Sequence, residues 1–169
     1  RAVRVGLGYD IHRVNAECTL VLGGVTFQDC PGLEGHSDAD VVFHAVADAL
    51  LGAAGLGDIG DHFPDDSPRW KDADSAEILS TAVRAVRENG GLRPHNVDVN
   101  VLAERPRLSP QKDAMRRNIA SLLDLPYGRV NVKARSAEGL GPVGHCRAIA
   151  AQAVVLLQQE KGQQPGSRS

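Results

Sequence analysis

The stretch VRVGLGYDIH, residues 3–12, places apolar side chains at alternate positions, Val3, Val5 and Leu7. This period of two is typical of a half-buried β-strand. The same alternation returns over residues 97–101 and 130–133, and shorter strand pieces are expected at residues 19–22 and 25–27. The sequence therefore predicts a sheet that buries one of its faces.

Helical spacing takes over between these strands. Apolar residues from positions 42 to 50 share one face, and Ser37 followed by Asp40 predicts a capping-box start for that helix. Further helices are expected over residues 78–86 and 115–123, and the apolar run over residues 149–157 is interpreted as a fourth. Strands and helices alternate only in part, which predicts an α/β fold, a single-domain two-layer α/β sandwich with a mixed sheet and its helices on one face.

Composition limits the class of protein. A chain of 169 residues has the size of one domain, which we expect over residues 1–161, with a disordered polar tail over residues 162–169. A formal net charge of −2 gives no bulk attraction to nucleic acid or to an anionic membrane. The apolar runs fall short of the ~20 residues that span a bilayer. We therefore expect a soluble protein without a nucleic-acid or membrane partner, and three cysteines without a CxxC pair favour a reducing compartment.

A candidate metal site begins at the end of the first strand. Asp10 and His12 are two residues apart, so in extended chain their side chains point to the same side and can share one ion. Such a pair alone is more often a turn or a cap. His44 adds a third candidate ligand on an otherwise apolar helix, where polar groups need a partner. Two histidines and one carboxylate leave one position of a tetrahedral zinc shell open for a substrate oxygen.

A second polar group follows the strand predicted over residues 130–133. Lys133, Arg135, Ser136 and Glu138 combine two cations, a hydroxyl and a carboxylate. This mixture suits a polyphosphate with a second, hard metal ion on Glu138. The acidic loop from residue 58 to 66 is either part of the site or simply solvated. The sequence therefore indicates a metal-dependent enzyme that acts on phosphate groups.

Longer motifs extend these observations, namely GYDIH at 8–12, GHSDAD at 35–40 and GDIG at 57–60. With residues 96–103, 105–110 and 130–138, they make nearly the whole chain resemble the 2-C-methyl-D-erythritol 2,4-cyclodiphosphate synthase family. The resemblance implies a homotrimer with active sites shared between subunits. It also implies cyclisation of 4-diphosphocytidyl-2-C-methyl-D-erythritol 2-phosphate, a cytidine diphosphate-linked substrate, with release of CMP, in the non-mevalonate route to isoprenoid precursors.

The same resemblance implies roles for individual residues. Asp10, His12 and His44 would hold one Zn²⁺ per subunit, and Glu138 would hold Mg²⁺ or Mn²⁺ bridging the substrate diphosphate. The nucleophile would be the substrate's own 2-phosphate, so no protein base is needed. The expected compartment is the cytoplasm in a bacterium, or the plastid stroma if a transit peptide was removed. The implied catalytic residues are His36, Ser37, Ser136 and Glu138, and the implied substrate-binding residues are Asp58, Gly60, Asp65, Ala103, Arg107, Leu108, Ser109, Lys133 and Arg135.

The chain also departs from the family pattern. Leu7 stands where histidine is usual, Ala39 where glycine is usual, and residues 135–137 replace a threonine run. Residues 142–148 differ as well, so the binding of an isoprenyl diphosphate on the trimer axis is not carried over. Two alternatives remain, a non-catalytic trimeric diphosphate-binding protein of the same fold and a zinc phosphohydrolase that uses water as its nucleophile. The mass of the product would separate them.

Overall fold

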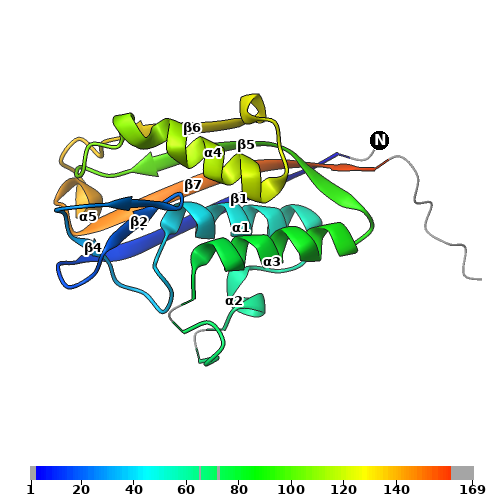
Figure 1. Cartoon of the computed structure of the whole chain (residues 1–169), viewed down its shortest axis with the longest axis horizontal. Coiled ribbons are helices and arrows are strands. Elements are labelled where there is room, and N and C mark those ends of the chain that lie inside the picture. The colour runs from blue at the N-terminus through cyan, green and yellow to red at the C-terminus, as the bar shows by residue number, and fades with distance from the viewer. Residues whose placement is uncertain (1–2, 65, 72, 161–169) are drawn as a thin grey trace, which may run out of the picture.

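A mixed sheet forms one layer of the molecule in this computed structural model, which describes residues 3–64, 66–71 and 73–160 (Figure 1). The five strands lie in the order β4-β1-β7-β5-β6, and a separate hairpin pairs β2 with β3. Only β5 and β6 are parallel neighbours, while the other adjacent pairs in the sheet are antiparallel. The strands are β1 (Val3–Asn15), β2 (Leu20–Leu22), β3 (Val25–Phe27), β4 (Gly32–Leu33), β5 (Leu92–Leu102), β6 (Val130–Arg135) and β7 (Ala148–Gln159).

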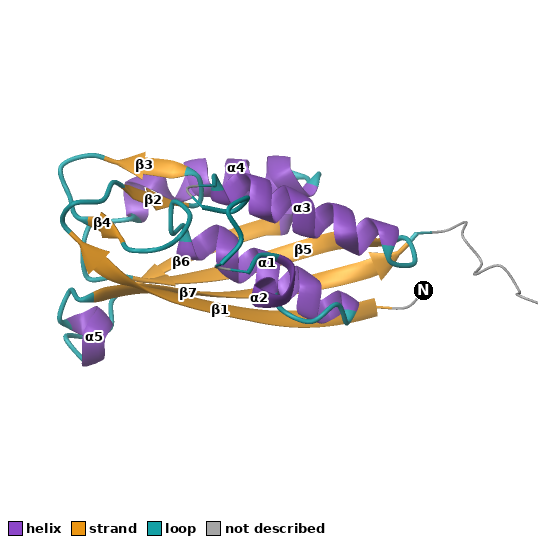
Figure 2. Cartoon of the chain, turned by 90° about the horizontal axis from the view of Figure 1, so that it is seen from below, coloured by secondary structure: helices purple, strands orange, loops and turns teal. Residues whose placement is uncertain are grey.

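Helices form the second layer. Figure 2 shows α1, α3 and α4 on one face of the sheet, as the two-layer prediction required. The short turns η1 (Ser109–Gln111) and η2 (Tyr127–Arg129) flank α4. The helices are α1 (Val41–Ala54), α2 (Ile59–His62), α3 (Ser75–Glu88), α4 (Lys112–Leu123) and α5 (Gly141–Gly144). None of the helices within the described ranges has the length and apolar character needed to cross a membrane.

Strand β1 and helix α1 pack in close backbone contact. A Cβ atom added to Gly6 would lie 1.9 Å from the carbonyl oxygen of Ala49, and one added to Gly8 would lie 1.9 Å from that of Ala45. Only glycine allows two backbones to approach so closely. Helix α1 is consequently buried almost all round, not on one face as predicted, with Asp48 and Gly52 as its exceptions.

Two sequence predictions about local structure are wrong. The apolar run after residue 148 is not a helix but strand β7, which pairs with β1 on one side and β5 on the other. A central strand of this kind reads as a continuous apolar run, which periodicity does not separate from a buried helix. The helix α1 is capped by Asp40, whose carboxylate accepts from the backbone N–H groups of Val42 and Phe43, not by Ser37.

The sheet face turned away from the helices is partly apolar. Val5, Leu7, Tyr9 and Val154 are 65%, 69%, 52% and 43% exposed in the single chain. Their strands β1 and β7 are neighbours, so these side chains form one patch. The predicted tail over residues 162–169 lies outside the described residues.

Candidate metal centre

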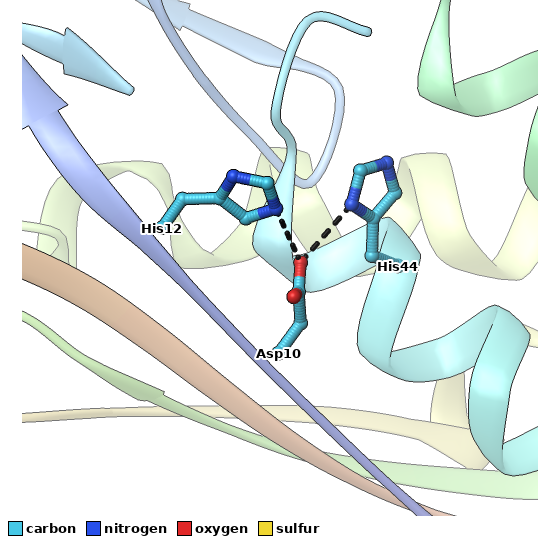
Figure 3. A group of neighbouring side chains, drawn as sticks. All are labelled: Asp10, His12 and His44. Atoms are coloured by element: carbon cyan, nitrogen blue, oxygen red, sulfur yellow. Dashed lines mark hydrogen bonds and ion pairs between the residues drawn. The ribbon is translucent and has the colours of Figure 1, made fainter. Parts of the chain in front are cut away.

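Asp10, His12 and His44 converge on one point, as Figure 3 shows. The Oδ2 atom of Asp10 lies 3.0 Å from Nε2 of His12 and 3.0 Å from Nδ1 of His44. The three candidate ligand atoms lie within 4.8 Å of one another, and no other group of three in the described part of the chain meets this test. The grouping predicted from the two-residue spacing and from the helical histidine is therefore confirmed.

The close packing of β1 and α1 brings these side chains together. Asp10 and His12 follow Gly8 on β1, and His44 lies in the first turns of α1. The start of α1 is fixed by Asp40, whose buried carboxylate also accepts from the N–H groups of Gly23 and Gly24 at 2.8 Å. Burial raises the pKa of Asp40 to about 6, although the backbone N–H groups around it favour the ionised form. Asp40 thus ties the β2–β3 hairpin to α1.

The centre is electrostatically prepared for a cation. Burial alone would raise the pKa of the Asp10 carboxyl, but hydrogen bonds and charge from His12 and His44, which the imidazoles supply when both ring nitrogens are protonated, outweigh burial and lower that pKa from 3.8 to about 2. Asp10 is therefore ionised at neutral pH. A carboxylate with two imidazoles is a common ligand set for zinc and leaves one coordination position open.

The outer nitrogen of each imidazole also has a partner. Nδ1 of His12 lies 2.6 Å from the carbonyl oxygen of Glu34. Nε2 of His44 lies 2.9 Å from the hydroxyl of Ser75 and 3.1 Å from that of Ser37. Partners of this kind fix the orientation of metal-binding histidines. The rings therefore present Nε2 of His12 and Nδ1 of His44 toward Asp10.

A cavity of about 370 Å³ opens beside the three side chains. Its apolar wall includes Phe63 and Trp70, whose rings meet edge to face at 4.7 Å. Three residues predicted for the site, His36, Ser37 and Gly60, line this cavity. Asp58 lies next to it as the N-cap of α2, where its carboxylate accepts from the N–H of Asp61 at 3.1 Å. Asp65 lies outside the described residues.

The other residues predicted for the site lie elsewhere in the described part of the chain, outside the lining of this cavity. They gather where β5 and β6 end, and the N–H of Ala103 bonds to the carbonyl oxygen of Arg135 at 2.9 Å. Strand β6 is separated from β1 by β7 and β5, which corresponds to about 14 Å across the sheet. The residues concerned are Ala103, Arg107, Leu108, Ser109, Lys133, Arg135, Ser136 and Glu138.

Within this second group, the loop after β6 is held by local contacts. Glu138 has a left-handed backbone with φ of 54°, which is strained for a residue with a side chain. The hydroxyl of Ser136 donates to the Glu138 carboxylate at 3.2 Å, and the N–H of Ala137 donates to Glu104 at 2.6 Å. Lys133 is paired with Asp98 at 2.6 Å, and Leu108 is buried. In a single chain, the predicted site therefore consists of two separate halves.

Sequence reasoning missed several residues near the metal centre. Ser75 and Asp38 lie behind His44, and Phe63 and Trp70 form a wall of the cavity. Asp38 belongs to a quoted motif, but its partner Ser75 lies 37 residues further on. No periodicity in the sequence connects positions so far apart.

Comparison with known proteins gives consistent results. A model of the YgbB family matches residues 3–158. The 2-C-methyl-D-erythritol 2,4-cyclodiphosphate synthase of Salinibacter ruber is 54% identical over 156 residues, which are 92% of this chain and 99% of that protein. The structure of the IspF of Plasmodium falciparum in complex with CDP matches with a TM-score of 0.82 and 34% identity, over 95% of this chain and 98% of that one. The bifunctional IspDF from Campylobacter jejuni matches with a TM-score of 0.89 and 42% identity, over 94% of this chain but 43% of the longer protein.

Proposed function

The chain belongs to the YgbB family, and from this premise we propose that Asp10, His12 and His44 bind the zinc ion of a cyclodiphosphate synthase. The reaction is the cyclisation of 4-diphosphocytidyl-2-C-methyl-D-erythritol 2-phosphate to 2-C-methyl-D-erythritol 2,4-cyclodiphosphate, with release of CMP, in the isoprenoid precursor pathway. The enzyme is of the lyase class. The non-catalytic alternative is not favoured, since relatives more than half identical over nearly their whole length are synthases.

One observation carries the metal assignment. Glu34 offers its carbonyl oxygen to Nδ1 of His12, and a carbonyl can only accept, so that nitrogen carries the proton. In the neutral ring, Nε2 of His12 then turns a lone pair toward the ionised carboxylate of Asp10 at 3.0 Å. Two acceptors that face each other at this distance favour a cation between them. A bound divalent ion would supply charge that polarises a phosphoryl oxygen and offsets phosphate repulsion.

The cavity residues then bind and orient the substrate. His36 and Ser37 contact its phosphate groups, and the apolar wall of Phe63 and Trp70 excludes water from the reacting atoms. Asp58, Gly60 and Asp65 border the methylerythritol part of the substrate. This arrangement aligns the 2-phosphate oxygen with the phosphorus that it attacks, while the protein supplies no base.

The second half of the site comes from a neighbouring subunit of a homotrimer. The separation of about 14 Å across the sheet supports this, because one chain does not bring the two halves together. The exposed apolar patch of Val5, Leu7, Tyr9 and Val154 supports burial against another copy. Glu138, whose carboxylate accepts from the Ser136 hydroxyl at 3.2 Å, would hold a second ion, Mg²⁺ or Mn²⁺, and that ion would supply positive charge to offset the charge of the substrate diphosphate.

The remaining residues of that half recognise the nucleotide and the diphosphate. Lys133 and Arg135 supply positive charge, and the segment from Ala103 through Arg107, Leu108 and Ser109 holds the cytidine. A solved relative bound to CDP supports such a nucleotide site. The compartment is the cytoplasm if the source is bacterial, and the plastid stroma if a transit peptide was removed.

The purified protein is incubated with the cytidyl substrate, zinc and magnesium, and products are identified by mass spectrometry. We expect CMP together with a cyclic diphosphate. A linear product, heavier by one water molecule, would support the phosphohydrolase instead. In parallel, the zinc content of His12→Ala is measured by elemental analysis, and unchanged zinc with intact folding would refute the ligand assignment.

A further inference from the structure

A chain of polar contacts runs from the metal centre through the helix layer. Nδ1 of His44 faces Asp10, and its Nε2 lies 2.9 Å from the hydroxyl of Ser75. The same hydroxyl donates to the carboxylate of Asp38. Ser75 is fully buried, and His44 is 9% exposed. The order of groups is therefore Asp10, His44, Ser75 and Asp38, and the two middle members are screened from solvent.

Asp38, the last group in this series of contacts, determines which way the hydroxyl proton of Ser75 points. The Asp38 carboxylate accepts from the N–H of Asp40 at 3.1 Å, from the N–H of Ser75 at 3.2 Å, and from the Ser75 hydroxyl. Three donors around two oxygens match an ionised carboxylate, which can only accept. Asp38 also lines a second, open cavity of about 430 Å³, where water can hydrate its charge. The single hydroxyl proton of Ser75 is therefore committed to Asp38.

The imidazole must then donate. Because the proton of Ser75 points to Asp38, its oxygen can interact with Nε2 of His44 only as an acceptor. Nε2 consequently carries a proton, and Nδ1 is left with a lone pair when the ring is neutral. That lone pair faces Asp10 at 3.0 Å, in the same way as the lone pair of His12.

We propose that Ser75, anchored by Asp38, is a positioning residue that holds His44 with Nε2 protonated and Nδ1 presented to the metal. This rests on the proposed metal function of Asp10, His12 and His44. The corresponding role for His12 falls to a backbone carbonyl, which no substitution removes. The support of His44 is therefore the one that side-chain changes can test.

Ser37 differs from Ser75 although both hydroxyls reach His44. Ser37 lines the substrate cavity, and its oxygen also accepts from the N–H of Ala39 at 3.2 Å. It has no carboxylate partner that directs its proton away from the imidazole among the hydrogen bonds of the described residues. Ser37 can therefore turn to a substrate phosphate while Ser75 keeps the ring in place.

The first test measures zinc affinity by competition with a chromogenic chelator. Ser75→Ala should weaken zinc binding by roughly 10–100-fold, and Ser75→Thr, which keeps the hydroxyl, should recover most of the loss. Ser80→Ala, on the exposed side of the same helix, is the control and should match the parent protein. Parent-like zinc affinity in folded Ser75→Ala would overturn the proposal, and so would a loss confined to Ser37→Ala.

The second test observes the proton itself in the zinc-loaded protein with ¹⁵N-labelled histidine. The Nε2–H of His44 should give a slowly exchanging downfield resonance that broadens in Ser75→Ala, while the Nδ1–H of His12 stays unchanged as an internal control. If Ser75→Ala fails to fold, Asp38→Asn decides, because an amide cannot accept from all three donors and should also weaken zinc binding. Unchanged affinity and resonance in folded Asp38→Asn would refute the anchor.

These outcomes also separate this inference from the function on which it rests. A parent protein that binds no zinc would remove the metal assignment and the positioning role together. A parent that binds zinc and forms the cyclic product, with Ser75→Ala indistinguishable from it in affinity and in the His44 resonance, would remove the positioning role alone.

Discussion

The two halves of the proposed site are built in different ways. The candidate ligands Asp10, His12 and His44 come from the long elements β1 and α1, and a backbone carbonyl or a buried hydroxyl holds each imidazole. Around Glu138, an exposed loop is held by contacts within itself and to Glu104. The first half is thus held by contacts between segments far apart in the sequence, whereas the second is held mainly by contacts within its own loop. Regular elements carry the proposed metal ligands, and a loop with a left-handed residue carries Glu138.

The largest effect is expected from disrupting the close packing of β1 against α1, which positions the metal half of the site. Gly8→Ala places a Cβ atom 1.9 Å from the carbonyl oxygen of Ala45, so β1 and α1 must separate. We expect a loss of about 3 kcal/mol or more in the free energy of unfolding, with loss of zinc binding. Urea denaturation measures the first and chelator competition the second. Gly52→Ala, where nothing lies within 4 Å of the added atom, should instead gain about 0.5–1 kcal/mol.

The second prediction tests whether the halves belong to different chains. His12→Ala and Glu138→Ala should each be inactive alone. When the two variants are refolded together in equal amounts, roughly one interface in four combines an intact metal half with an intact loop half. The mixture should recover up to about a quarter of parent activity. If native mass spectrometry confirms mixed trimers and activity stays absent, the two halves do not meet across a subunit boundary.

The third prediction uses pH to measure the ion pairing within the metal half. The pKa of Asp10 falls from 3.8 to about 2 on folding, so its ionised form stabilises the metal-free protein above about pH 4. This contribution is lost as the pH falls toward 2 and should shrink by about 1 kcal/mol between pH 5 and pH 3. The advantage of the parent over Asp10→Asn in urea denaturation with a chelator present should decrease accordingly. A pH-independent difference would contradict the pairing.

The smallest effect is expected in the loop. Glu138→Gly removes the cost of a left-handed backbone but adds freedom to the unfolded chain, so the free energy of unfolding should change by less than about 1 kcal/mol. Activity should nevertheless be lost. Arg84→Gly, at an exposed position of helix α3, is the matched control and should lose about 1 kcal/mol of unfolding free energy. A large destabilisation by Glu138→Gly would mean that the loop supports the fold as the metal half does.

Residues related by local spacing could be predicted from the sequence, whereas contacts between distant segments could not. The spacing of Asp10 and His12 predicts that their side chains point the same way, because residues two apart in a strand lie on the same face of the sheet. His44 was found because a polar side chain is conspicuous in an apolar helix. The apolar run of strand β7 predicts a helix as readily as a strand, because apolar residues lie on both faces of this strand, Val154 on the exposed one. The role of Ser75 was not predicted from the sequence, because its partners Asp38 and His44 lie 37 and 31 residues away along the chain.

Trp70 gives the protein a built-in optical reporter. It is the only tryptophan in the sequence, it is 8% exposed, and it lies in the wall of the cavity against Phe63 with the guanidinium of Arg69 4.6 Å from its ring centre. Indole emission depends on the polarity and charge of its surroundings, and here those surroundings include the cavity that is proposed to bind the substrate. Ligand binding in this cavity can therefore be followed by fluorescence without a label, and all of the indole emission comes from one position beside the proposed metal centre.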